Sequence, residues 1–98
     1  MSAYVISEVT ERDAEQFARY RELASESIAA FGGEYLVRGT LPDAAEGEWD
    51  TAARLVIVRF PDRATLHDWY ESTAYAPARA LSNTALRRRL IFADGMAP

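Results

Sequence analysis

Arginine residues lie within or beside the apolar segments of this sequence, where a guanidinium group could bind an anion. Arg38 ends the segment EYLVR, Arg54 begins the segment RLVIVRF, and Arg59 lies near the end of that second segment. A guanidinium keeps its proton and offers five N–H donors, which suits a carboxylate or a phosphate. We therefore expect Arg38 or Arg54 to anchor an anionic group of a ligand.

A second interpretation of these arginines needs no ligand. Charged groups at strand ends commonly stay in water or form ion pairs, and Glu8, Glu34 and Asp94 lie in neighbouring segments. Strict alternation along an extended strand would place Glu34, Leu36 and Arg38 on one face. Both interpretations are kept open at this point.

Aromatic residues form the second group that could contact a ligand. Trp49 lies in a segment from Gly39 to Ala53 that is long for a loop in a compact domain. It could cover the mouth of a pocket, or it could pin the loop down by an apolar contact. Tyr35, Tyr70 and Tyr75 could offer rings and hydroxyl groups to a ligand, or they could be core residues with a solvated edge.

Residue types that the sequence lacks exclude several kinds of chemistry. All eleven basic residues are Arg, so no lysine can form a Schiff base, and the absence of Cys removes thiol nucleophiles and thiolate metal sites. A haem or metal site through His67, the single His, is the least favoured interpretation. The acidic segment 43–50 lacks the residue spacing of a calcium loop. We expect no cofactor and no metal.

The charge balance and the hydropathy pattern bound the partners and the location. The net charge of -4 argues against nucleic acid, and we interpret the arginine run at positions 87–89 as a solvated turn. No apolar run is long enough to cross a membrane, and no export signal is visible at the start of the sequence. We expect a cytoplasmic protein whose residues 1–98 form one domain.

Local patterns predict an α+β fold. Asp13 and Asp62 are suited to begin helices, Gly32-Gly33 to end the first one, and Pro77 to begin a short helix that runs to about Asn83. β-Branched apolar segments predict strands over residues 3–9, 34–38, 54–60 and 90–94. The resulting order is βαββαβ, which is the ferredoxin-like arrangement with an antiparallel sheet.

Two of these strands are apolar on both faces. Positions 55–58 read LVIV and positions 90–92 read LIF, whereas a strand with one solvated face should alternate. The helices can cover only one face of the sheet. We therefore expect a second copy of the chain to cover the other face, in a homodimer whose sheets pack back to back.

Several segments resemble one known family. The segment from Phe31 to Gly39 is similar to the signature YGG-x-YLVRGG of the domain-of-unknown-function 1330 family, and Glu46 to Trp49 resembles its loop EG-x-W. Residues 55–61 and 69–75 resemble its run VVIEFP…WY-x-S-x-x-Y. Thr40 and Arg59 depart from the family pattern, because glycine and glutamate are usual at those positions.

The resemblance implies a dimeric α+β barrel, in which two subunits pack their ferredoxin-like sheets together. It gives no established activity, because the wider superfamily includes cofactor-free monooxygenases, haem-degrading enzymes, isomerases and ligand-sensing modules. The polar and aromatic positions that match the family are Tyr35, Arg38, Glu46, Trp49, Arg54, Tyr70 and Tyr75.

The leading hypothesis is a homodimer that binds a small anionic or aromatic metabolite in a pocket. Arg38 or Arg54 would anchor the anion, and Trp49, Tyr70, Tyr75 and Tyr35 would contribute to the walls. Catalysis would then be of a cofactor-free monooxygenase or isomerase type. The alternative is a non-enzymatic dimerisation or accessory module without a ligand.

Overall fold

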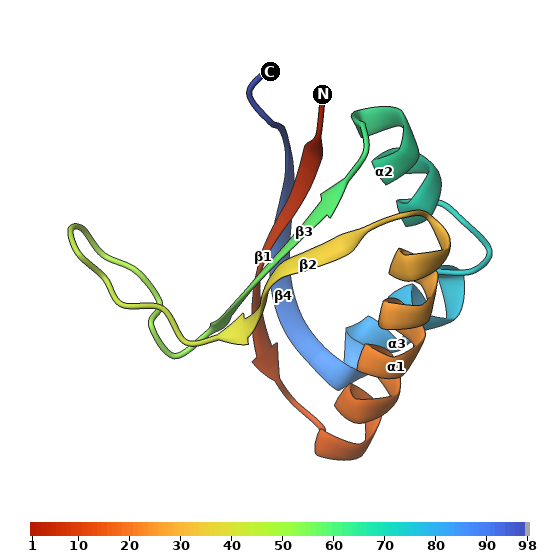
Figure 1. Cartoon of the computed structure of the whole chain (residues 1–98). Coiled ribbons are helices and arrows are strands. Elements are labelled where there is room, and N and C mark those ends of the chain that lie inside the picture. Colours follow the sequence, from red (N-terminus) through yellow and green to blue (C-terminus); the bar gives the residue numbers. More distant parts are fainter. Residues whose placement is uncertain (98) are drawn as a thin grey trace.

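The sheet forms one layer, and the helices form a second layer against one of its faces (Figure 1). The computed structural model describes residues 1–97, and none of its helices is long and apolar enough to span a membrane. Four antiparallel strands lie in the order β2-β3-β1-β4. The elements along the chain are β1 (Ala3–Glu11), α1 (Ala14–Ala30), β2 (Glu34–Thr40), β3 (Arg54–Phe60), α2 (Arg63–Tyr70), α3 (Ala76–Ala85) and β4 (Leu86–Asp94). The predicted ferredoxin-like α+β fold is confirmed.

The helices begin and end where short side-chain signals place them. The carboxylates of Asp13 and Asp62 accept hydrogen bonds from the backbone N–H groups of Gln16 and Thr65, at 2.9 and 2.7 Å. Each bond satisfies one of the donors that a first helical turn leaves without a partner. Gly32, with a φ of 74°, turns the chain out of α1 in the left-handed region that favours glycine.

Strands β1 and β4 are longer than the sequence patterns indicate. Strand β4 begins at Leu86, so the arginine run at 87–89 lies inside the strand and is not the solvated turn that we expected. In the register, positions 87 to 89 lie opposite positions 10 to 8 of β1. Arg88 therefore alternates with Leu90 and Phe92 toward the face that packs against the helices, which we call the inner face.

Rows of directly opposed residues describe the inner face. One row joins Phe92, Val5, Val58 and Tyr35 across all four strands, and the next joins Leu90, Ser7, Val56 and Arg38. The row after that joins Arg88, Val9 and Arg54. The inner face therefore changes from apolar at one end of the sheet to cationic at the other.

A bulge in β2 decides which face Arg38 occupies. Tyr35 lies opposite Val58 and Val37 lies opposite Ile57, so Leu36 is an extra residue against a single step of β3. Without this bulge, strict alternation would keep Arg38 on the outer face together with Glu34. The expectation that these residues share a face is therefore wrong, and Arg38 belongs to the inner face.

The core lies where α2 and α3 meet the apolar end of the inner face. Phe60, Leu66 and Tyr75 are fully buried, and the rings of Trp69 and Tyr75 lie 4.2 Å apart between centroids. The indole Nε1 of Trp69 donates a 3.0 Å hydrogen bond to the hydroxyl of Ser27 in α1. The core therefore ties all three helices to the sheet.

No element of the described residues covers the outer face, and a row of branched apolar residues crosses it. The row joins Ile91, Ile6, Ile57 and Val37 across all four strands. The side chain of Ile91 is 62% exposed. Ion pairs flank the row on both sides, between Arg59 and Glu34 and between Arg89 and Glu8.

Residues 41–53 connect β2 to β3 as a long arm that projects away from the helices (Figure 1). The arm carries four carboxylates and no basic residue. Internal hydrogen bonds hold it, from the indole Nε1 of Trp49 to the carbonyl oxygen of Glu46 at 2.8 Å and from the N–H of Ala52 to the carboxylate of Asp50 at 3.0 Å. The arm is therefore an acidic structure at the end of the sheet where Arg54 and Arg88 lie.

Close packing at Gly33 gives a first prediction. A methyl group at this position would lie 2.7 Å from Cγ2 of Ile28 and 2.8 Å from Cε1 of Phe60. We expect Gly33→Ala to lower the free energy of unfolding by about 1–3 kcal/mol, measured by urea unfolding. The same change should cost less in an Ile28→Ala background, because the nearest obstacle is then absent. An equal cost in both backgrounds would contradict this packing.

Candidate ligand pocket

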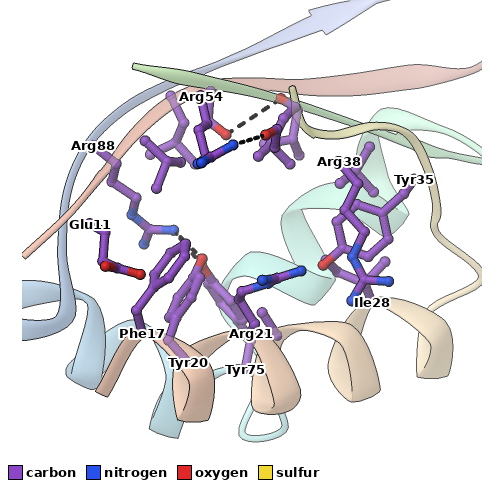
Figure 2. A pocket seen from close by; sticks show the side chains of 18 of the residues that line it. Glu11, Phe17, Tyr20, Arg21, Ile28, Tyr35, Arg38, Arg54, Tyr75 and Arg88 are labelled. Atoms are coloured by element: carbon purple, nitrogen blue, oxygen red, sulfur yellow. Dashed lines mark hydrogen bonds between the residues drawn. The ribbon is translucent and has the colours of Figure 1, made fainter. Parts of the chain in front are cut away.

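A cavity of about 420 Å³ lies between the inner face of the sheet and α1 (Figure 2). Its apolar wall includes Val5, Val56 and Val58 from the sheet, Ile28 from α1 and Trp69 from α2. The volume falls within the range of pockets that hold small molecules. We call this cavity the inner pocket.

Positive charge dominates the polar wall of the inner pocket. Arg21, Arg38, Arg54 and Arg88 line it from α1, β2, β3 and β4, whereas Glu11 is the one carboxylate on the wall. Within residues 1–97, none of these four guanidinium groups forms an ion pair with a carboxylate. Arg59 and Arg89 of the outer face, in contrast, are paired with Glu34 and Glu8.

Neutral partners hold two of these arginines. Arg38 donates through Nη2 to the hydroxyl oxygen of Ser25 at 2.8 Å, and its guanidinium lies 4.5 Å from the ring centroid of Tyr35. Arg54 donates through Nη1 to the carbonyl oxygen of Gly39 at 2.8 Å. These contacts orient the side chains without neutralising their charge.

Arg88 forms the most enclosed polar cluster of the pocket with two phenols. Its Nη1 atom lies 2.7 Å from Oη of Tyr20 and 2.7 Å from Oη of Tyr75, and the two phenol oxygens are 3.2 Å apart. Its Nη2 atom donates to the hydroxyl of Ser82 at 3.4 Å. Figure 2 shows Arg88 reaching from the sheet toward the hydroxyl groups that rise from the helical layer.

The protonation state of Tyr20 follows from its surroundings. Burial, and after it the neighbouring Tyr75, raise the pKa of the Tyr20 phenol well above its usual value, and the charge of Arg88 opposes this shift only in part. Tyr20 is therefore a neutral hydrogen-bond donor and acceptor at neutral pH.

Four of the six residues predicted to contact a ligand line the inner pocket, namely Tyr35, Arg38, Arg54 and Tyr75. They come together because β2 and β3 present them from adjacent strands and Tyr75 begins α3 beneath the sheet. Their contact with a ligand stays a prediction.

Trp49 and Tyr70 lie outside the pocket wall. Trp49 is 66% exposed on the arm, so within a single chain it is neither a lid over the pocket nor an apolar plug. Tyr70 packs beneath the guanidinium of Arg79, whose carbon lies 4.2 Å from the ring centroid. Trp69 lines the pocket instead, because adjacent residues of a helix point about 100° apart.

Sequence reasoning missed Arg88, Tyr20 and Arg21. Tyr20 has the helical spacing of a core residue and its ring packs against the core, but its hydroxyl reaches Arg88. One signal in the sequence could have found Arg88. It lies two residues before Leu90 and four before Phe92, so a strand that begins earlier places all three side chains on the inner face. No pattern in the sequence distinguished Arg21 from the other charged residues of its helix.

The ion-pair interpretation is correct for Arg59, which pairs with Glu34. Asp94 pairs instead with Arg63 of α2, at 2.9 Å. His67 lies exposed on α2 with its ring edge-on to Phe92. The described part of the chain contains no group of three His, Asp or Glu residues placed to hold a metal ion.

A comparison with models of known protein families finds a match along nearly the whole sequence. The family described as a domain of unknown function, DUF1330, matches residues 2–96. The chain belongs to this family. None of the curated proteins compared with the sequence matches it.

Solved structures share the fold of this DUF1330 chain at low sequence identity. A protein of unknown function from Rhodopseudomonas palustris has 19% identity and a TM-score of 0.79, over 99% of this chain and 84% of that one. A dimeric ferredoxin-like protein of unknown function from Jannaschia has 10% identity and a TM-score of 0.72, over 97% and 100%. SnoaB, a cofactor-independent oxygenase from Streptomyces nogalater, has 12% identity and a TM-score of 0.61, over 99% and 95%. These likenesses establish the fold and carry no residue roles.

Tyr20 makes the stability of the DUF1330 chain depend on pH in the alkaline range. The pKa of this phenol is higher in the folded chain than in the unfolded chain, where a tyrosine has a pKa of about 10. Folding therefore favours the protonated phenol. This contribution to stability is complete below about pH 10 and is lost as the pH rises further. We expect Tyr20→Phe to flatten the fall in unfolding free energy between about pH 10 and 12. Urea unfolding at several pH values measures this slope, and an unchanged slope would refute the assignment.

Proposed function

We propose that the chain binds a small anionic, partly aromatic or apolar metabolite in the inner pocket, and that it does so as a homodimer in the cytoplasm. The observation that carries the ligand proposal is the imbalance of charge on the pocket wall, where four guanidinium groups accompany one carboxylate. An accessory module with a filled core needs neither the cavity nor this imbalance.

Electrostatics favours an anion in this position. The half-buried guanidinium of Arg88 loses part of its hydration, and groups of like charge that face one cavity repel one another. A bound carboxylate offsets both costs through charge-assisted hydrogen bonds. The valine side chains and Trp69 at the other end of the pocket suit an apolar or aromatic body.

Catalysis without a resident cofactor extends this proposal. SnoaB is a cofactor-independent oxygenase that shares the fold, and the pocket of this chain offers a protonated phenol beside a guanidinium, two donors that suit negative charge developing on a substrate. Native mass spectrometry of the purified protein would reveal a co-purified ligand. Incubation of that ligand with the protein in air then separates the cases: a gain of oxygen indicates an oxygenase, rearrangement at constant mass an isomerase, and no change a binding protein.

The homodimer proposal rests on the outer face. The row of three isoleucines and one valine is self-complementary across a two-fold axis, and the ion pairs on both sides of it satisfy the charged groups that a second sheet would bury. A second copy of the chain is the occupant that fits this pattern, because its own row would pack against the first.

Two probes that match in shape and differ in charge test the ligand proposal. We expect 2-naphthoate to bind at least about tenfold more tightly than the neutral 2-naphthamide, measured by isothermal titration calorimetry, because one charge-assisted hydrogen bond is worth about that factor. Arg38→Ala should weaken the binding of 2-naphthoate and leave the mass of the assembly unchanged. Arg19→Ala, at an exposed position of α1 outside the pocket wall, is the matched control and should retain wild-type affinity. Equal binding of the two probes would exclude an anion site.

A charge placed in the isoleucine row tests the homodimer. We expect Ile91→Arg to shift the protein from two chains to one by native mass spectrometry, because an unpaired charge at an apolar interface is costly. Ala18→Arg, at an exposed position of α1, is the control and should leave two chains. A single-chain mass for the wild-type protein would contradict the proposal directly.

A further inference from the structure

Counting protons in the cluster of Arg88, Tyr20 and Tyr75 reveals a donor without a partner. Each phenol oxygen accepts from Nη1 of Arg88, and each phenol also has one O–H proton of its own. The contact between the two oxygens uses at most one of these protons. Within residues 1–97, neither hydroxyl group makes a further hydrogen bond. At least one O–H proton is therefore available to the inner pocket.

We infer that this available O–H group and the guanidinium of Arg88 together form the subsite that binds the ligand's carboxylate. The inference rests on the proposed function, because it assigns the anionic end of the same ligand. It differs from the sequence expectation, which gave this role to Arg38 or Arg54.

The cluster is better suited to this role than the other arginines because it is held from several sides. The phenol of Tyr75 comes from a fully buried residue whose ring packs against Trp69. Ser82, which is buried in α3, accepts from Nη2 of Arg88 and itself donates to the carbonyl oxygen of Arg79 at 2.7 Å. A donor array that is already oriented loses little entropy when it binds.

The chemistry of the cluster specifies the partner atom. Arg88 is a donor only, and the high pKa of Tyr20 keeps that phenol protonated, so the subsite presents donors to the cavity. A negatively charged oxygen accepts hydrogen bonds from these donors, whereas the positive charge of Arg88 would repel an ammonium group. Arg54 lies in the same row as Arg88 with one strand between them, about 10 Å away along the sheet, so its charge reinforces the anion without sharing the first contact.

Either phenol can supply the O–H donor of the subsite, so we expect the loss of one hydroxyl group to have little effect on binding. If Tyr20 becomes Phe, the Tyr75 hydroxyl loses its phenol neighbour at 3.2 Å, and the space that the Tyr20 hydroxyl filled opens the buried Tyr75 hydroxyl to the cavity. If Tyr75 becomes Phe, Tyr20 takes the same role. We expect each single variant to bind 2-naphthoate within about threefold of wild type, and the double variant to lose at least about tenfold. Both changes keep the ring and its packing.

Arg88→Gln and Arg87→Gln form the matched pair for charge. Both remove one positive charge from adjacent positions of β4, but Arg87 is exposed on the outer face. We expect Arg88→Gln to weaken the binding of 2-naphthoate at least about tenfold and Arg87→Gln to leave it unchanged. Urea unfolding of every variant, with and without the probe, shows that the affinities refer to folded protein.

The outcomes separate this inference from the proposed function. If wild-type protein binds 2-naphthoate and Arg88→Gln and the double phenol variant bind it equally well, the cluster is structural and the inference is wrong, while the anion site itself stands with Arg38 or Arg54 as its anchor. If the two single phenol variants lose as much affinity as the double variant, the interchange of donors is wrong. If wild-type protein does not bind 2-naphthoate, both proposals fail.

Discussion

Positive charge that is partly shielded from water and has no carboxylate partner is the constraint on which this structure depends. The guanidinium of Arg88 lies against two phenols and a serine hydroxyl, and neutral groups also hold Arg38 and Arg54. Neutral acceptors orient a guanidinium but leave its charge in place. The inner pocket therefore has a cationic end and an apolar end. An anion with an apolar body would satisfy the charge of one end and pack against the other.

The sheet creates this arrangement through its register. Alternation sends Arg88 and Arg54 to the inner face in one row, and the bulge at Leu36 sends Arg38 to the same face in the next. The same alternation gives the outer face its isoleucine row, so the pocket and the proposed dimer surface are two consequences of one pattern. The bulge matters most, because a regular β2 would turn Arg38 away from the cavity.

The sequence predicts much of the fold and part of the site. Capping residues, terminal glycines and β-branched segments are local signals, and they locate every helix and strand of the structure to within a few residues. The two-sided apolar strands also indicate the uncovered outer face. Arg88 escaped prediction because a run of three arginines favours solvent on composition alone, and only pairing with β1 shows that it is part of a strand. Tyr20 looked like a core residue because its ring is one, and no local pattern shows where a hydroxyl group will point. Trp49 was expected near the pocket because large aromatic residues are usually covered, yet the arm exposes it.

The central claim is that an anion binds in the inner pocket, at its cationic end. The most direct measurement is a map of NMR chemical-shift changes, including the arginine side-chain N–H signals, as 2-naphthoate is added to isotope-labelled protein. The account predicts the largest changes at Arg88, at Ser7 and Val9 of β1 and at Tyr20 and Ala24 of α1, all of which line the cavity. Changes confined to the outer face or to the arm would contradict it.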